Sequence, residues 1–420
     1  MSRNLDAIIF GASSYTGQFV IEEALEILKD FRWGIAGRNE KKLKRMLSDI
    51  EAKVKKDLSH VPIIIADVND TSSLEIMAKQ CRIVLNCCGP YNILGEPVVK
   101  ACIDAGTHHV DITGEPQFIG NMLLKYNDLA KEKGVYIVYA CGLESVPAEL
   151  GVLFAEEHFG GIINSIELYM DVKQTQSDSN ARQIFHTGTW NSLIYSFKYA
   201  CEILKLERQL NKEKLPPTKP KLWLKPFPHQ IETSHRYYCY FPATDKFVIE
   251  RSQRYFYDSQ KKRPIQFESY IGFRSFWLAL LWPFYVILLL ILSQFTWSRK
   301  ALLRSPHLFS FGLVSAEKPL QSVQNSIEFA MTLKAKGRYH EVPDFVEPKK
   351  ELVVRVSGKN PIYGVTSNAM LICAKTILNE NSKMPEKGGV LSPASAFAKT
   401  QIIEEITRTK YGLKFDVIKT

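Results

Sequence analysis

The stretch from Leu5 to Gly17 holds residue types that could bind the diphosphate of a dinucleotide. An apolar run ends at Gly11 and an amphipathic segment starts near Gly17, which together predict a strand, a tight turn and a helix. Gly11 permits the sharp turn, Gly17 lets helix and strand pack closely, and the N–H groups of the first helical turn attract a pyrophosphate. Ser14 stands where the usual central glycine would be. An ordinary strand, turn and helix without a ligand is the alternative.

Arg38 is the residue most informative about the nucleotide. It lies about 20 positions after Gly17, at the end of the second predicted strand, where an acidic residue would accept a hydrogen bond from the ribose 2′-hydroxyl of NAD. A guanidinium at this point suits a 2′-phosphate instead. We therefore predict NADP in preference to NAD. A surface arginine that opens a solvated helix is the alternative.

Further candidate residues follow the third and fourth predicted strands. Asp67 could meet the adenine amino group, or could simply begin a turn with the polar residues after it. The run NCCGPY, from Asn86 to Tyr91, closes the fourth strand at the carboxyl edge of the sheet, over the expected cofactor crevice. Asn86 and Gly89 are expected cofactor contacts, and Tyr91 is a candidate catalytic residue.

Asp111 and Glu115 follow the fifth predicted strand in the run HHVDITGE. Two histidines and two carboxylates suggest a metal, but adjacent strand residues point to opposite faces, so His108 and His109 cannot both line one site. No metal is expected. Asp111 and Glu115 are candidate proton handlers or substrate anchors, and capping of the next helix is the alternative.

Six apolar strands alternate with helices through the first 150 residues, which predicts a doubly wound parallel sheet of the Rossmann type with both faces covered. Thr71 or Ser72 is expected to cap the helix after the third strand. The predicted strands are Leu5–Phe10, Arg32–Gly37, Val61–Ala66, Ile83–Cys88, His108–Ile112 and Val135–Ala140.

The regular alternation ends after Gly142, which predicts a second, mixed α/β domain over residues 151–360. Its sheet is expected to be antiparallel, and a helix is expected over 183–206. Residues 361–420 are expected to be helical, at 369–378 and 395–410, and to return to the first domain, 1–150. The strands predicted for the second domain are 165–172, 236–240, 247–249, 326–334 and 351–357.

Residues 275–298 carry no charge and are bounded by basic residues. The segment is long enough to cross a bilayer core of about 30 Å, yet Pro283 near its middle favours a kink. Trp277, Trp282 and Trp297 suit a membrane interface. We expect association with a membrane or lipid-droplet surface, by a kinked hairpin that dips into one leaflet rather than by a span. A buried helical hairpin or a dimer contact is the alternative.

Composition excludes some classes of function. The net charge of +10, from 54 basic and 44 acidic residues, is modest for a nucleic-acid binder, and no nucleic-acid-binding motif accompanies it. An acidic ligand or an anionic membrane surface explains the excess as well. The eight cysteines never form a CxxC pair and are expected to be reduced, as on the cytosolic face of a membrane. No room is left for a secretory signal before the first strand.

Several of these runs resemble one known family. GASSYTG, AGRN, NCCGPY, VDITGE, CGLESVPAELG and the late GGVLSPA are similar to the saccharopine dehydrogenase-like oxidoreductases, a branch of the saccharopine dehydrogenase family. The resemblance implies NAD(P)-dependent oxidoreduction and association with lipid droplets or membranes. It places Gly11, Ser14, Tyr15, Thr16 and Gly17 at the phosphate-binding turn and Arg38 at the ribose phosphate. The apolar segment is foreign to the soluble lysine-pathway enzymes, so saccharopine itself is not expected as the substrate.

Two hypotheses follow. The first is an NADP-preferring oxidoreductase at a lipid droplet or membrane, whose small-molecule substrate is unknown, with a lipidic molecule as one candidate from lipid metabolism. The second is a non-catalytic lipid-surface protein that keeps the fold as a scaffold, because fold alone does not determine function. A homodimer and a mitochondrial location are left open.

Overall fold

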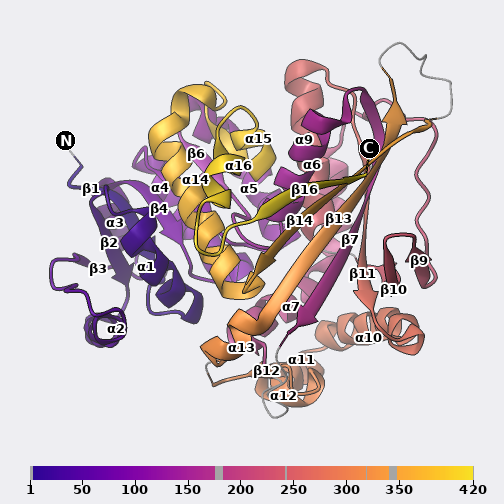
Figure 1. Cartoon of the computed structure of the whole chain (residues 1–420). Coiled ribbons are helices and arrows are strands. Elements are labelled where there is room, and N and C mark those ends of the chain that lie inside the picture. Colours follow the sequence, from indigo (N-terminus) through magenta and orange to yellow (C-terminus); the bar gives the residue numbers. More distant parts are fainter. Residues whose placement is uncertain (1–2, 176–182, 242–243, 318, 340–347, 420) are drawn as a thin grey trace.

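The computed structural model describes residues 3–175, 183–241, 244–317, 319–339 and 348–419. Two seven-stranded sheets lie side by side (Figure 1), and a third sheet is a ribbon of two short strands. Most strands of the first sheet come from the N-terminal part of the chain and most strands of the second from its middle, and each sheet gains one strand from near the C-terminus. The core of the molecule lies on the faces of these two sheets, in two large clusters of buried apolar side chains.

The first sheet is parallel throughout, with the strand order β15-β6-β5-β4-β1-β2-β3. This confirms the predicted Rossmann sheet, and it adds a seventh strand, β15, from near the C-terminus. The strands are β1 (Leu5–Phe10), β2 (Trp33–Gly37), β3 (Ile63–Ile65), β4 (Cys81–Asn86), β5 (His108–Asp111), β6 (Tyr136–Val138) and β15 (Gly389–Leu391).

Helices follow the strands of this sheet in the expected alternation. They are α1 (Tyr15–Ile27), α2 (Glu40–Val54), α3 (Thr71–Lys79), α4 (Tyr91–Asp104), α5 (Pro116–Glu132) and α6 (Val146–Phe159). The predicted cap of α3 was wrong. Asp70 is the N-cap, and its side chain accepts hydrogen bonds from the N–H groups of Ser72 and Ser73. A carboxylate suits this place better than a hydroxyl because it also interacts favourably with the helix dipole.

The second sheet is mixed, with the order β16-β14-β13-β7-β11-β10-β9. Its central strands β7 and β11 are parallel, whereas the other pairs are antiparallel, so the expectation of an antiparallel sheet holds only in part. The strands are β7 (Ile162–Gln174), β9 (His229–Ile231), β10 (Ser234–Tyr240), β11 (Gln266–Phe273), β13 (Ile327–Arg338), β14 (Lys350–Lys359) and β16 (Lys414–Lys419).

The strand predicted at 247–249 was wrong, because these residues lie in the long helix α9 (Thr244–Gln260). Phe247 packs in one large apolar cluster and Ile249 in the other, so the helix lies between the two cores. Three apolar residues in a row fit a strand or a buried helix equally well.

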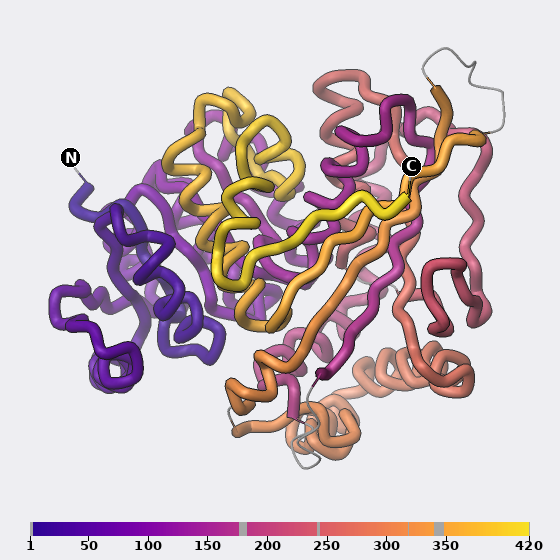
Figure 2. Tube along the Cα trace, viewed as in Figure 1, coloured from indigo at the N-terminus to yellow at the C-terminus, as the bar shows by residue number. Residues whose placement is uncertain are grey.

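The C-terminal part of the chain contributes to both sheets. Helix α14 (Thr366–Glu380) packs against α1, β4 and β5, after a π-helical turn, η1 (Pro361–Val365). Residues 395–410 do not form the single helix that was predicted; they hold the end of α15 (Pro393–Phe397) and α16 (Ile402–Thr407). Figure 2 shows the yellow chain then crossing to the second sheet, where it ends as β16.

The apolar segment forms one helix, α10 (Phe276–Gln294), with Pro283 inside it, and not a hairpin. Together with α11 and α12 it lies along one side of the molecule, at the bottom of Figure 1. The remaining elements of the chain are β8 (Phe185–His186), α7 (Thr187–Lys198), α8 (Ala200–Leu210), α11 (Thr296–Arg304), α12 (Pro306–Phe309), β12 (Val314–Ser315), α13 (Gln321–Ser326) and a short 3₁₀ turn at Asn381–Lys383. The predicted helix over 183–206 is thus β8, α7 and part of α8.

Candidate cofactor site

The turn between β1 and α1 has no room for side chains at its two glycines. Gly11 has a φ of +75°, and a Cβ there would lie 2.9 Å from the backbone of Cys87 and Cys88 at the end of β4. A Cβ on Gly17 would lie 2.6 Å from the carbonyl oxygen of Gly11. Both glycines therefore do what the sequence predicts: one makes the turn and the other lets α1 approach β1 closely.

We expect Gly17→Ala to lower the free energy of unfolding by about 1–3 kcal/mol, as overpacked sites do. The added methyl would meet backbone oxygens, which cannot move aside as a side chain could. Urea unfolding measures the loss. Gly188→Ala is the matched control in the first turn of α7, since its Cβ would lie 3.7 Å from the nearest atom. Equal unfolding midpoints for the two variants would contradict this prediction.

Ser14 and Tyr15 begin α1. Ser14 is the N-cap, and its Oγ accepts a hydrogen bond from the N–H of Gly17 at 3.0 Å. The Tyr15 side chain is held by distant parts of the chain: its hydroxyl donates to the Pro319 carbonyl at 2.8 Å, and its ring stacks on His186. Thr16 lies in the same first turn and is half-buried. The backbone of this turn is thus at the predicted phosphate position, while the Tyr15 ring contacts the second domain.

Arg38 and Asp67 lie at the same sheet edge as the end of β4. Arg38 directly follows β2 and is exposed. Burial raises the pKa of the Cys88 thiol, the Arg38 charge lowers it and the Asp67 charge raises it further, so both charges act on the end of β4. Asp67 Oδ1 accepts hydrogen bonds from the backbone N–H and the side-chain amide of Asn69. Asp67 thus begins a turn with the polar residues after it, which was the alternative to a contact with adenine. Both charged groups therefore lie near the carboxyl end of β4, and Arg38 is exposed there.

Asn86 and Tyr91 are linked at the carboxyl end of β4. Asn86 Oδ1 accepts a hydrogen bond from the Cys88 N–H at 3.0 Å. The Tyr91 hydroxyl is buried and donates to the Asn86 carbonyl at 2.8 Å. Gly89, by contrast, is exposed. The Tyr91 hydroxyl is therefore engaged with the backbone, whereas Gly89 borders the solvent.

Glu115 is a helix cap, but for the preceding helix and not for the next one. Its carboxylate is buried and accepts hydrogen bonds from the N–H groups of Tyr91 and Asn92, at 2.9 and 2.8 Å. These are the first residues of α4, whose own N-cap, Pro90, has no side chain able to accept a hydrogen bond. Burial raises the pKa of Glu115, and the two backbone donors lower it. Glu115 thus holds α4 at the crevice edge.

Asp111 is buried at the end of β5 and joins two loops. Its Oδ1 accepts hydrogen bonds from the N–H groups of Thr113 and Ala140, both at 3.0 Å. Its Oδ2 lies 3.9 Å from Nδ1 of the buried His109. Burial raises the pKa of Asp111 to about 7, although the two N–H donors lower it, and burial lowers the pKa of His109 to about 3. Asp111 can therefore hold or release a proton near neutral pH, beside a neutral imidazole.

The raised pKa of Asp111 predicts a falling stability as the pH rises from about 4 to about 7. In this range the unfolded chain loses the proton while the folded chain keeps it, so the free energy of unfolding falls by up to about 4 kcal/mol. In Asp111→Asn an amide replaces the protonated acid, and this part of the pH dependence should vanish. Urea unfolding at several pH values measures it, with Asp49→Asn on the exposed face of α2 as the control. An unchanged slope in Asp111→Asn would contradict the assignment.

Several buried polar atoms at this edge have no hydrogen-bond partner among the described residues. Some of these atoms belong to residues at or just beyond the carboxyl ends of β4 to β6. The others lie in the first turn of α14, which is joined to this edge by the hydrogen bond from the Leu143 N–H to Thr366 Oγ1. Such atoms usually face a ligand or ordered water. Together with the glycine turn, they fit a polar dinucleotide. The atoms are Asn86 Nδ2, Asp111 Oδ2, Ser145 Oγ, and Nδ2 and Oδ1 of Asn368.

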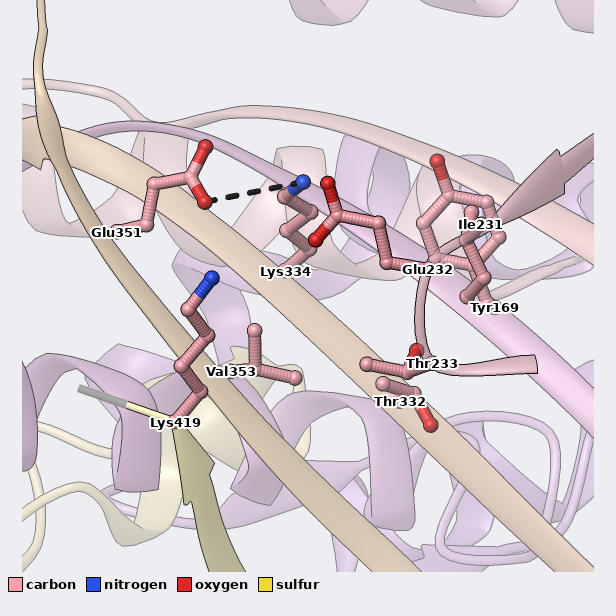
Figure 3. A pocket seen from close by; sticks show the side chains of 9 residues that line it. All are labelled: Tyr169, Ile231, Glu232, Thr233, Thr332, Lys334, Glu351, Val353 and Lys419. Atoms are coloured by element: carbon pink, nitrogen blue, oxygen red, sulfur yellow. Dashed lines mark ion pairs between the residues drawn. The ribbon is translucent and has the colours of Figure 1, made fainter.

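Two cavities lie elsewhere. One, of about 20 Å³, lies on the second sheet, where Lys334 and Glu351 form an ion pair at 3.8 Å (Figure 3). This is room for about one water molecule. A larger one, of about 360 Å³, borders His108 and Tyr136 at the amino ends of β5 and β6. Ligands of doubly wound sheets bind at the carboxyl ends, so neither cavity competes for the nucleotide. In the described ranges no three His, Cys, Asp or Glu side chains come together to hold a metal ion.

Comparisons with known proteins identify the family of this chain and its N-terminal domain. The family model of the saccharopine dehydrogenase NADP-binding domain matches residues 7–138. The human saccharopine dehydrogenase-like oxidoreductase is 34% identical over 100% of this chain and 98% of its own length. A Caenorhabditis elegans relative named lipid droplet localized protein is 32% identical over 99% of both chains.

A solved structure has the same fold. The saccharopine dehydrogenase (L-Glu forming) of Saccharomyces cerevisiae superposes with a TM-score of 0.57 at 13% identity, over 99% of this chain and 100% of that one. Because residues 7–138 match the saccharopine dehydrogenase NADP-binding domain, the domain with the glycine turn and Arg38 binds NADP. The chain belongs to the saccharopine dehydrogenase-like oxidoreductases.

Proposed function

We propose that the protein is an NADP-dependent oxidoreductase that works at the surface of a membrane or lipid droplet, on a small lipidic molecule. The observation that carries the lipid part is the exposed face of α10. Only 17% of the most apolar 18-residue stretch of this helix is buried inside the protein, whereas the core helix of a soluble protein would be mostly buried. The exposed residues recur at helical spacing and include no charge: Trp277, Leu281, Phe284, Leu288, Ile291 and Phe295.

The way α10 is attached favours a helix that lies in the plane of one leaflet. At its start, the Phe276 ring packs on Tyr237, with centroids 5.5 Å apart. At its end, the Gln294 side-chain amide donates to the carbonyl of Phe197 at 2.7 Å. Leu289, between them, is 3% exposed and packs on α7. Because the helix is held along its whole length, a span would require it to leave the protein, while in-plane docking requires no rearrangement.

The name of the C. elegans relative supports a lipid droplet as one such surface. The basic residues Arg274 and Lys300, on either side of the apolar segment, suit the phosphate groups of a phospholipid layer. A lipidic substrate follows from this location, because molecules dissolved in the lipid layer would be concentrated there.

Bound NADPH supplies a hydride, and the protein supplies position and the exclusion of water. The backbone of the β1–α1 turn would bind the diphosphate and Arg38 the 2′-phosphate. Glu115 holds α4 at the crevice edge through Tyr91 and Asn92. Asp111 is the buried carboxyl able to exchange a proton near neutral pH.

A non-catalytic lipid-surface protein is the second candidate. It is favoured by one observation: the Glu115 carboxylate and the Tyr91 hydroxyl, two of the three candidate proton handlers, both bond to the backbone of the protein.

Titration with NADPH, followed by its fluorescence, distinguishes the two candidates. Saturable binding at micromolar NADPH is what the enzyme requires, and no binding at millimolar NADPH would support the scaffold.

A further inference from the structure

A small hydrophobic cluster lies between the apolar helix and the nucleotide-binding domain. Its buried members come from four elements of the chain: Trp190 and Ile194 of α7, Leu289 of α10, Leu302 of α11 and Val314 of β12. The indole N–H of Trp190 donates to the Leu302 carbonyl at 2.9 Å, which fixes α7 to α11. This cluster is separate from the cores of the two large sheets.

Helix α7 has two faces with different neighbours. Trp190, Ile194 and Phe197 recur at helical spacing and face the apolar cluster that contains α10. Ser192, on the other face, lies beside Glu115, which caps α4 at the cofactor edge, and it lowers the pKa of that carboxyl group. It also lies opposite Gly89, where a Cβ would be 3.7 Å from its Oγ. One helix therefore touches both the lipid-facing helix and the cofactor edge.

The ribbon of β8 and β12 makes a second connection. Its two strands are parallel and pair Val314 with Phe185 and Ser315 with His186. Val314 packs in the apolar cluster, whereas the His186 ring stacks on Tyr15 in the first turn of α1, with centroids 5.4 Å apart. Just beyond β12, the Pro319 carbonyl accepts the hydrogen bond from the Tyr15 hydroxyl. The helix turn that receives the diphosphate is thus held by the elements that carry α10.

We propose that α7 and the β8–β12 ribbon couple the two sites, so that docking of α10 on lipid strengthens NADPH binding and NADPH strengthens docking. This inference rests on the proposed function. We expect the coupling to be positive because of this arrangement. The apolar stripe of α10 is exposed in the same conformation in which His186 and Pro319 contact Tyr15, so the lipid surface and NADPH would bind the same conformation. Two ligands that each favour the same conformation reinforce each other by the same factor.

The test is NADPH titration of the full chain with and without vesicles of phosphatidylcholine and phosphatidylserine. We expect the Kd for NADPH to fall about fivefold or more with vesicles, and vesicle binding to tighten by the same factor with NADPH. In His186→Asn the ratio of the NADPH Kd without vesicles to the NADPH Kd with vesicles should fall towards one. Asparagine keeps the N-cap of α7, which the His186 ring now provides to the Gly188 N–H, but it removes the stacking on Tyr15.

The control is Phe284→Glu on the exposed face of α10, 65% exposed and remote from the turn. Its Kd for NADPH in buffer should equal that of the unaltered protein and should no longer respond to vesicles. An NADPH Kd within twofold with and without vesicles, while both ligands bind, would overturn the coupling and leave the proposed function intact. A failure to bind NADPH, or to bind vesicles, would overturn the proposed function and the coupling with it.

Discussion

Phe284→Glu combined with Ile291→Glu will release the protein from vesicles and lipid droplets into the soluble fraction. Both side chains lie on the exposed stripe of α10, and neither belongs to the buried cluster on its other side. Placing a carboxylate in the apolar layer costs about 2–3 kcal/mol per residue, so the two together should weaken binding by at least a hundredfold. Flotation of the protein with vesicles on a density gradient measures this directly.

The matched control carries the same two charges on another surface. Ile76 of α3 and Leu124 of α5 are also exposed apolar residues, but they lie on the nucleotide-binding domain. Ile76→Glu with Leu124→Glu should float like the unaltered protein. Point changes are preferable to deleting 276–292, because deletion would remove Leu289 and uncover Trp190 and Ile194. If the α10 double variant still floats, the lipid part of the proposed function is wrong.

Arg38→Asp should reverse the nucleotide preference. Arg38 is exposed directly after β2, next to the crevice edge, so its guanidinium can reach a 2′-phosphate without a change of fold. Charge-assisted hydrogen bonds are worth about 1.5–3 kcal/mol, and an aspartate would add repulsion. We therefore expect NADPH affinity to fall by about 10–100-fold or more, with NADH affinity unchanged or improved. Competitive titration with NADPH and NADH gives the ratio.

Arg45→Asp provides the comparison for a general loss of positive charge. Arg45 is exposed on α2, seven residues after Arg38, which lies just before that helix. It should leave the ratio of the two affinities within about twofold, since screening weakens charge effects beyond about 10 Å. An unchanged ratio in Arg38→Asp would show that Arg38 does not read the 2′-phosphate.

Local patterns carried most of the correct predictions. The first six strands are nearly continuous apolar runs that end in glycine or polar residues, so periodicity alone found them. The glycine turn and Arg38 are likewise contiguous signals. β15, by contrast, was not predicted, and it is only three residues long. Residues 247–249 are three apolar residues in a row, and so short a run has no periodicity that distinguishes a strand from a helix.

Long-range contacts could not be predicted from the sequence. Glu115 caps a helix that begins 24 residues before it, and only folding brings the two together. The Tyr15 hydroxyl meets a carbonyl 304 residues away. In both cases the residue type shows a capacity for hydrogen bonding, but the partner depends on how the two sheets are placed. The roles of α7 and of the β8–β12 ribbon belong to the same class.

The late synthesis of β15 leaves the first sheet incomplete while the chain is being made. On the ribosome, β6 emerges early, but its outer edge waits for Gly389–Leu391, about 250 residues later. At about 5–20 residues per second this delay is roughly 10–50 s. An unpaired edge of this kind can recruit a strand from another nascent chain, and the shortness of β6, three residues, limits that hazard. Chaperone protection of the growing polypeptide is therefore most valuable in this interval.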